Sequence, residues 1–388
     1  MISPLTSTRN RHIAGVGLSR DRVMDGAKAR MPEGTTLVSA DNHWGLAEDP
    51  WKGRVPAHLA NRVPTVWWDE DIGLWNWRVG DGPAVFNAER AAGLKTVEDR
   101  RGTAIIEDRL ADMDADGVAM EINFPQLLPM FNRHPDFEAR AWIFRIYNEY
   151  MAEVAARAPG RFHGVGFSNF WDMTQCEASL RHMKDLGLKT FMLPLTPGND
   201  AQGRPIHYAS AEMDVLWATA EELDLPVFFH AGENLPVGNP GGSVANMLGI
   251  FMPFRKQFSD LVFGGILDRH PNLKIIFAES GINWIPGMLQ DAEMIVDSCE
   301  EIMDPKLAMR PTEYWQRNCY STVMSDAIGF KLLDYIGADR VMFAVDYPHN
   351  EGVQGYTRGA IEDIVEAVSP DDARKILGGT AIEVFNLG

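Results

Sequence analysis

The chain has 388 residues, 45% of them hydrophobic and 23% charged, which is the composition of an ordinary globular protein. Its formal net charge of −18 opposes contact with nucleic-acid phosphates and with anionic membrane surfaces, so we exclude both as partners. No stretch approaches the roughly eighteen consecutive apolar residues of a membrane-spanning helix. Three widely spaced cysteines and a first segment without a secretory pattern predict a cytoplasmic protein.

Residues 1–33 are polar, mixed in charge and without hydrophobic periodicity, so we expect a loose arm before a main domain at 34–388. From residue 34 onward, short apolar runs alternate with helical patterns. The apolar runs predict strands at Thr35–Ala40, Val118–Asn123, Phe162–Phe167, Thr190–Leu195, Pro226–His230, Lys274–Ala278, Cys319–Val323 and Val341–Val345. The helical patterns include Phe137–Ala158, Ala211–Leu223 and Asp371–Phe385.

This alternation of strands and helices predicts an α/β fold. Eight strands that alternate with helices over this length are typical of a (β/α)8 TIM barrel. A doubly wound open sheet is the alternative, but that fold normally places a glycine-rich phosphate loop after its first strand. Here the first strand ends in ADNHW instead. We therefore predict the barrel.

A tryptophan-rich insertion, at about residues 45–105, follows the first predicted strand. Six of the eleven tryptophans lie in or beside it, at Trp44, Trp51, Trp67, Trp68, Trp75 and Trp77. The segment VWWDEDIGLWNWRV alternates about an acidic turn, which predicts a β-hairpin. Loops after strands lie at the catalytic face of a barrel, so the insertion is expected at that face. We interpret it first as a satellite core or a subunit interface, where tryptophan is also common, and alternatively as an aromatic wall or lid over the substrate.

Ionisable residues stand at the ends of four predicted strands. Asp41 and His43 follow the first strand and point the same way, because side chains alternate with a period of two. His230 ends the fifth strand, Glu279 follows the sixth and Asp346 follows the last. Three carboxylates around one point repel each other unless a cation lies between them. We therefore predict one divalent metal, zinc first and manganese second, held by Asp41, His43, His230 and Asp346.

The candidate catalytic residues are Asp346, Glu279 and His349. Glu279 is expected to act as a general base with a raised pKa, as an extra ligand, or as a structural residue. His349, in DYPHNEG, either donates to the substrate or supports the metal from behind a ligand, with a structural role as the alternative.

Several stretches together resemble the amidohydrolase superfamily. They are ADNHW, RLADMDADGVAMEINFP, LWATAEELDLPVFFHAGE, GGILDRHPNLKIIFAESGINWIP and RVMFAVDYPHNEG. Within the superfamily, the chain is similar to the amidohydrolase-2 group, which contains aminocarboxymuconate-semialdehyde and resorcylate decarboxylases. The resemblance implies ligand roles for Asp41, His43, His230 and Asp346, and implies that Asp346 also orients or deprotonates a water. The decarboxylases carry a histidine where this chain has Glu279.

The charge of this rim bears on the reaction. Three carboxylates and one divalent cation leave a net charge of −1, which disfavours a carboxylate substrate unless an arginine compensates, and Arg255 is the nearest candidate. We therefore predict a metal-dependent hydrolase of a small aromatic or cyclic substrate that uses a metal-activated water. The alternatives are a metal-dependent non-oxidative decarboxylase of an aromatic or unsaturated carboxylic acid, and a catalytically silent scaffold. A homodimer is the expected assembly.

Overall fold

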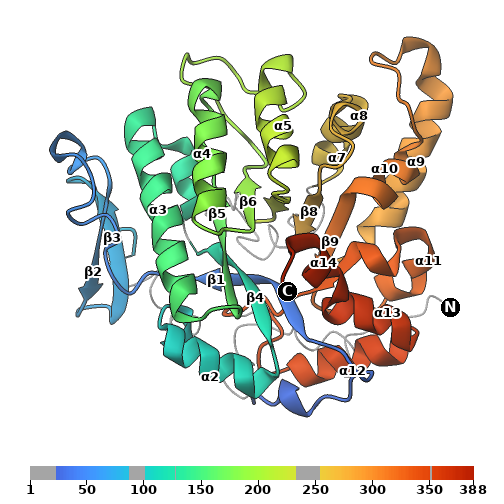
Figure 1. Cartoon of the computed structure of the whole chain (residues 1–388), viewed down its shortest axis with the longest axis horizontal. Helices are drawn as coiled ribbons and strands as arrows, with labels where there is room; N and C mark the ends of the chain where they lie inside the picture. Colours follow the sequence, from blue (N-terminus) through green and yellow to red (C-terminus); the bar gives the residue numbers. More distant parts are fainter. Residues whose placement is uncertain (1–22, 87–100, 127, 233–253, 350–351) are drawn as a thin grey trace, which may run out of the picture.

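One parallel sheet organises the chain in this computed structural model, which describes residues 23–86, 101–126, 128–232, 254–349 and 352–388. Within these residues the sheet has eight strands in the order β1-β4-β5-β6-β7-β8-β9-β10 (Figure 1). They are β1 (Val38–Trp44), β4 (Met120–Pro125), β5 (Phe162–Phe167), β6 (Thr190–Leu193), β7 (Val227–His230), β8 (Ile275–Ala278), β9 (Cys319–Val323) and β10 (Val341–Phe343).

The two ends of the sheet meet at a seam between β1 and the segment after β10. The backbone N–H of Asp346 donates to Asp41 O at 2.8 Å, and the N–H of His43 donates to Tyr347 O at 2.6 Å. These bonds bring the first and last strands together, so the sheet forms a nearly closed barrel. The predicted TIM barrel is confirmed, and the open doubly wound sheet is wrong.

Helices surround the barrel (Figure 1). Asp136 caps the N-terminus of α3 by accepting from Ala139 N, and Asp172 caps α4 by accepting from Thr174 N. The α-helices are α2 (Ile106–Asp116), α3 (Phe137–Arg157), α4 (Met173–Asp185), α5 (Asp214–Glu222), α7 (Arg255–Phe263), α8 (Ile266–Arg269), α9 (Trp284–Cys299), α10 (Pro311–Asn318), α11 (Leu333–Ile336), α12 (Thr357–Ala367), α13 (Pro370–Arg374) and α14 (Thr380–Phe385).

Strand β1 is buried along its whole length, as expected for a parallel strand covered on both faces. It begins three residues later than predicted and extends to Trp44, so Asp41 and His43 lie inside the strand and not after it. The reason is pairing with β4, where Asn42 lies opposite Asn123 and His43 opposite Phe124. His43 is therefore fixed by the ladder, whereas Asp41 lies where the register shifts between Ser39 and Asn42.

The tryptophan-rich insertion contains the predicted hairpin, with β2 (Pro64–Asp69) antiparallel to β3 (Leu74–Val79). It lies outside the barrel and is joined to α3 (Figure 1). Trp51 Nε1 donates to Ile143 O at 3.1 Å, and Arg54 pairs with Glu149 at 2.9 Å. Residues 87–100 of the predicted insertion are outside the described residues.

The predicted N-terminal arm is described only from residue 23. This part includes the short helix η4 (Gly26–Lys28), and Gly26 N donates to Asp116 Oδ1 of α2 at 3.2 Å. Gly26 therefore anchors this segment to α2, and residues 1–22 are outside the described residues. In the described part of the chain, no helix has the length and apolar character needed to cross a membrane. The cytoplasmic location and the homodimer stay predictions.

The C-terminal helix predicted at Asp371–Phe385 is instead broken into α13, η12 (Lys375–Gly379) and α14. Gly378 leaves the helical conformation, with φ 175° and ψ −27°. A Cβ at this position would lie 1.9 Å from Thr36 O, just before β1. The break lets the C-terminal segment press against the chain that leads into β1.

We expect Gly378→Ala to lower the free energy of unfolding by about 1–3 kcal/mol, because the added methyl group has no room beside the Thr36 carbonyl. Urea unfolding followed by circular dichroism measures the change. Gly379→Ala is the matched control, since its Cβ would meet its nearest atom, Arg374 O, only at 3.2 Å. Equal losses in the two variants would contradict the packing argument.

Candidate metal centre

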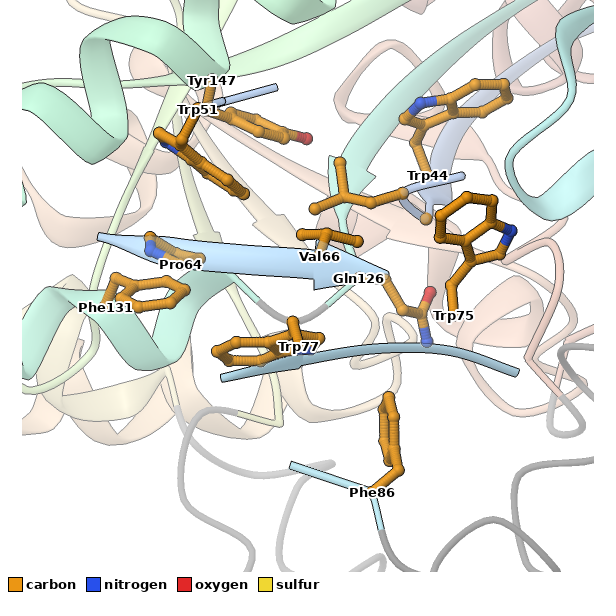
Figure 2. A pocket seen from close by; sticks show the side chains of 12 residues that line it. Trp44, Trp51, Pro64, Val66, Trp75, Trp77, Phe86, Gln126, Phe131 and Tyr147 are labelled. Atoms are coloured by element: carbon orange, nitrogen blue, oxygen red, sulfur yellow. The ribbon is translucent and has the colours of Figure 1, made fainter. Parts of the chain in front are cut away.

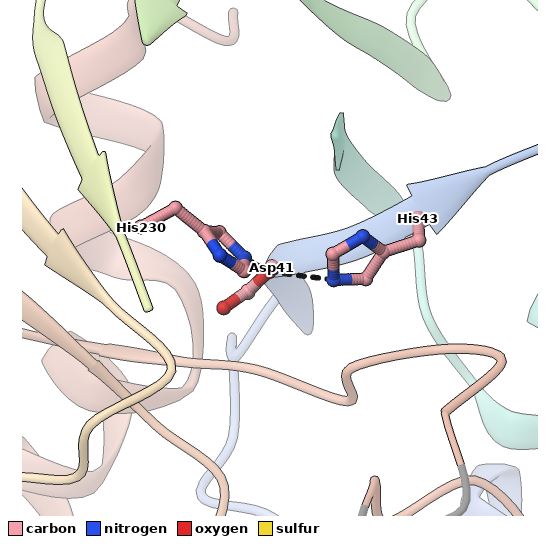
Figure 3. A group of neighbouring side chains, drawn as sticks. All are labelled: Asp41, His43 and His230. Atoms are coloured by element: carbon pink, nitrogen blue, oxygen red, sulfur yellow. Dashed lines mark hydrogen bonds and ion pairs between the residues drawn. The ribbon is translucent and has the colours of Figure 1, made fainter. Parts of the chain in front are cut away.

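Side chains from β1 and β7 converge at the C-terminal end of the barrel, where both histidines point toward Asp41 (Figure 3). His230 ends β7, and its Nε2 lies 3.2 Å from Asp41 Oδ1. His43 Nε2 lies 3.8 Å from the same oxygen. One ligand atom from each of the three lies within 4.8 Å of the others, which is close enough to share one ion.

A second group of potential ligands shares His43 with the first and adds Asp346 and His349. His43 Nε2 lies 3.2 Å from Asp346 Oδ1, and His349 Nδ1 lies 2.9 Å from that oxygen. The imidazole rings of His43 and His349 have centroids 3.9 Å apart. The four predicted ligands are thus linked through His43, which belongs to both groups, and His349 lies beside Asp346.

Glu279 follows β8 and faces two histidines of the site. Its Oε2 lies 3.5 Å from His230 Nδ1, and its Oε1 lies 3.8 Å from His349 Nδ1. Thr322 of β9, which the sequence analysis did not single out, connects this residue to Asp41. The Thr322 hydroxyl accepts from Glu279 N at 3.0 Å and lies 3.5 Å from Asp41 Oδ2.

The two carboxylates that follow strands occupy an unusual backbone conformation. Glu279 has φ 64° and Asp346 has φ 58°, in the left-handed region that residues other than glycine rarely adopt. Such a conformation persists only where surrounding contacts hold it, and it is common at functional sites. Here the contacts are Glu279 N to the Thr322 hydroxyl and Asp346 N to Asp41 O.

The buried polar atoms of this cluster fit a metal ion. Asp346 is fully buried, and neither of its carboxylate oxygens has a hydrogen bond to any described residue. Both ring nitrogens of the buried His43 also lack a hydrogen bond to any described residue. The neighbours of Asp346 Oδ1 are the imidazoles of His349 and His43. A buried carboxylate is very costly unless its charge is compensated, and a cation between Asp346 and His43 would supply that compensation.

Burial and neighbouring charges shift the pKa values of three side chains in the cluster, in different directions. Burial, followed by the nearby His349 and His230, holds the pKa of His43 well below its usual value, so its imidazole is neutral and offers a lone pair. Burial lowers the pKa of His230, but Asp41 and Glu279 outweigh it and raise the value to about 9. Burial, and then Asp346, raise the pKa of Glu279 to about 7.

Hydrogen bonding settles which nitrogen of His230 faces the cluster. His230 Nδ1 lies 2.7 Å from Ala231 O, and since a carbonyl only accepts, Nδ1 carries the proton. The Nε2 atom is left toward Asp41, as in histidine ligands whose other nitrogen is held by a backbone carbonyl.

Arg109 of α2 is fully buried next to the seam between β1 and the segment after β10. The sequence analysis did not single it out. It pairs with Glu121 of β4 at 3.0 Å and donates to the backbone oxygen of His43. Its guanidinium also lies 4.0 Å from the ring centroid of Tyr347, the residue after Asp346. Arg109 stands in the quoted stretch RLADMDADGVAMEINFP, but nothing local in that stretch marks it as buried.

Arg255, the expected counter-charge, does not lie at this cluster. It begins α7 and pairs with Asp291 at 2.5 Å, with 44% of its side chain exposed. Arg255 was only the nearest candidate by its position in the chain, and the ion pair with Asp291 gives its charge a partner at the surface instead. A position after β7 does not show in which direction a long side chain points.

By its fold and its site, this protein is a (β/α)8 barrel with histidines and carboxylates gathered at the C-terminal ends of its strands. A family model described as Amidohydrolase matches residues 55–387, so the chain belongs to the amidohydrolase family, as its motifs implied. The matched residues begin after β1, and the match therefore does not include Asp41 and His43.

A curated relative agrees with this family, and two solved structures share the fold. The chain is 27% identical over 266 residues to γ-resorcylate decarboxylase of Rhizobium radiobacter, covering 63% of this chain and 77% of that protein. An amidohydrolase of Mycobacterium avium subsp. paratuberculosis has a TM-score of 0.71 at 17% identity, covering 92% of this chain and 100% of that one. A dihydroxybenzoic acid decarboxylase of Polaromonas sp. JS666, solved with manganese and 2-nitroresorcinol, has a TM-score of 0.64 at 20% identity, covering 91% and 97%.

We expect protein purified without added metal or chelator to contain about one zinc or manganese ion per chain, measured by elemental analysis. Asp346→Asn should lose most of the metal, because the substitution removes the charge of a fully buried carboxylate. Asp291→Asn, at the surface ion pair with Arg255, is the control and should keep it. If the chain binds neither zinc nor manganese after reconstitution, the metal hypothesis is wrong.

Arg109→Met should lower the free energy of unfolding by about 3–5 kcal/mol, since it leaves Glu121 buried without its charge partner. Denaturant unfolding of metal-free protein gives the value. In contrast, Arg181→Met removes an ion pair whose arginine is 41% exposed, and it should cost at most about 1 kcal/mol. Similar small losses in both would show that Arg109 does not hold the seam.

Proposed function

We propose that this chain is an enzyme that uses a divalent metal to decarboxylate a small aromatic or unsaturated carboxylic acid without oxidation. The observation that carries the proposal is the buried histidine–carboxylate cluster in a chain similar to a γ-resorcylate decarboxylase over 77% of that protein. The cluster suits a substrate that offers oxygen atoms to a metal ion.

In this proposal Asp41, His43, His230 and Asp346 hold the ion. Their nitrogen and oxygen atoms suit zinc or manganese, and the related Polaromonas decarboxylase with bound manganese supports the second choice. Once bound, the ion supplies positive charge that orients the substrate carboxylate and a neighbouring oxygen.

The remaining chemistry is a proton transfer. Decarboxylation breaks the bond between the carboxylate carbon and the ring carbon, carbon dioxide leaves, and the bonding electrons stay on the ring carbon, which takes a proton. In this proposal Asp346, Glu279 and His349 handle that proton. His349 Nδ1 lies 2.9 Å from Asp346 Oδ1 and 3.8 Å from Glu279 Oε1, so a proton held by one group is within reach of the next.

Hydrolysis is the second candidate, and Glu279 is the observation that favours it. Glu279 stands where the decarboxylases carry a histidine, and its carboxylate lies in a nearly buried position, 10% exposed. In a hydrolase, Asp346 or Glu279 would take a proton from the attacking water and return it to the leaving group. Such a reaction consumes water and suits a neutral ester, amide or lactone.

The two candidates differ in the fate of solvent atoms. We expect the manganese- or zinc-loaded protein to release carbon dioxide from 2,6-dihydroxybenzoate or a related hydroxybenzoate. In deuterated water the product should carry one deuterium at the former carboxylate position, and no oxygen from ¹⁸O-labelled water should enter it. Mass spectrometry of the product reads both labels.

Asp346→Asn should reduce this rate by orders of magnitude, while Asp291→Asn should leave it unchanged. Incorporation of ¹⁸O into the product of an ester or lactone, with no carbon dioxide from any aromatic acid, would favour the hydrolase instead.

A further inference from the structure

A small cavity lies between the insertion, the end of β1 and α3 (Figure 2). Its walls are mainly aromatic and come from Trp44, Trp51, Trp75, Trp77, Phe86 and Phe131. We call it the insertion cavity. Aromatic walls of this kind suit an apolar group, and taken alone they would also suit a plain satellite core.

Two polar atoms make the insertion cavity unlike a plain core. Tyr147 of α3 and Gln126, just after β4, both line it. The hydroxyl of Tyr147 is fully buried, and no described residue forms a hydrogen bond with it. The side-chain oxygen of Gln126 is also buried without a partner. Buried polar groups are costly when unpaired, so these two indicate a ligand that supplies the missing partners.

Gln126 also connects the insertion cavity to the candidate metal centre. Its Nε2 lies 3.0 Å from His349 Nε2, and the other nitrogen of that ring lies 2.9 Å from Asp346 Oδ1. The side chain of Gln126 therefore reaches from the cavity wall to His349, beside the candidate metal centre.

The size of the cavity limits its occupant. Its volume is about 40 Å³, whereas an apolar cavity that takes up benzene has roughly 150 Å³. A second ring is therefore too large, but a group of two or three heavy atoms fits. The Tyr147 hydroxyl is neutral, since burial raises its pKa well above the usual value, and it can donate a hydrogen bond.

We propose that the insertion cavity is a specificity subsite for a short, oxygen-bearing substituent on the ring of an aromatic acid, such as a methoxy or hydroxymethyl group. Tyr147 donates to the substituent's oxygen, and the indole rings surround its carbon. The substrate carboxylate lies at the metal centre, so this inference rests on the proposed function.

The test compares ligands that differ in one atom of the substituent. Binding of 2-hydroxybenzoates with a methoxy or an ethyl group at ring position 3, 4 or 5 is measured by calorimetry on the manganese-loaded chain. Methoxy and ethyl have nearly the same size, but only methoxy accepts a hydrogen bond. We expect one methoxy isomer to bind roughly five- to tenfold more tightly than its ethyl counterpart.

Tyr147→Phe should abolish this preference without weakening the ethyl compound, because only the hydroxyl is removed. Tyr208→Phe is the control. Tyr208 is a buried tyrosine outside the cavity, and its hydroxyl donates to Pro194 O at 2.7 Å. If Tyr147 were a purely structural residue, the preference would be the same in all three proteins.

The subsite is refuted if no methoxy isomer is preferred, if no hydroxybenzoate binds, or if the preference survives Tyr147→Phe. Release of carbon dioxide from the same compounds is recorded separately. A methoxy preference without carbon dioxide supports the subsite and contradicts the proposed decarboxylation. Release of carbon dioxide without any methoxy preference supports the proposed decarboxylation and contradicts the subsite.

Discussion

Three largely buried carboxylates, those of Asp41, Glu279 and Asp346, each lie within 3.5 Å of a histidine of one cluster, and this concentration of acidic groups is the constraint around which the site is built. Asp41 and Asp346 are also neighbours in the backbone, because Asp346 N donates to Asp41 O at 2.8 Å. The seam that closes the barrel and the point where negative charge accumulates are thus the same place. A cation at this place would compensate the negative charge. In the metal-free chain His230 supplies part of the positive charge, because its raised pKa keeps its imidazole protonated.

The seam between β1 and the segment after β10 is stabilised by a residue that does not occupy the candidate metal centre. Arg109 provides this support from behind β1, where it pairs with Glu121 and donates to the backbone oxygen of His43. Because its charge is matched by Glu121, the arginine fixes the strand without serving as the counter-ion of the ligands. The insertion is attached in a comparable way, through Trp51 and α3, so that its aromatic side chains lie next to the ligand-bearing end of β1.

The sequence allowed the barrel and the four candidate ligands to be predicted because both depend on local patterns. Strand β9, at Cys319–Val323, has the predicted bounds, and a polar residue at the end of an apolar strand marks the rim of a barrel. The parts that could not be predicted depend on contacts between distant segments. Gly378 breaks a helix because Thr36 lies against it, and Arg109 and Tyr147 are ordinary helix residues until the fold buries them.

Glu279 links the charge of the site to the choice between the two reactions. The count of −1 that favoured a hydrolase treats Glu279 as ionised. In the metal-free chain, however, burial and the neighbouring Asp346 raise the pKa of Glu279 to about 7. When Glu279 holds its proton, two carboxylates and a divalent cation leave the centre neutral, and a carboxylate substrate is no longer repelled. The same proton is then available, near His349, for transfer to a ring carbon. A glutamate in place of the decarboxylases' histidine is thus compatible with decarboxylation, because it is both a removable charge and a proton donor.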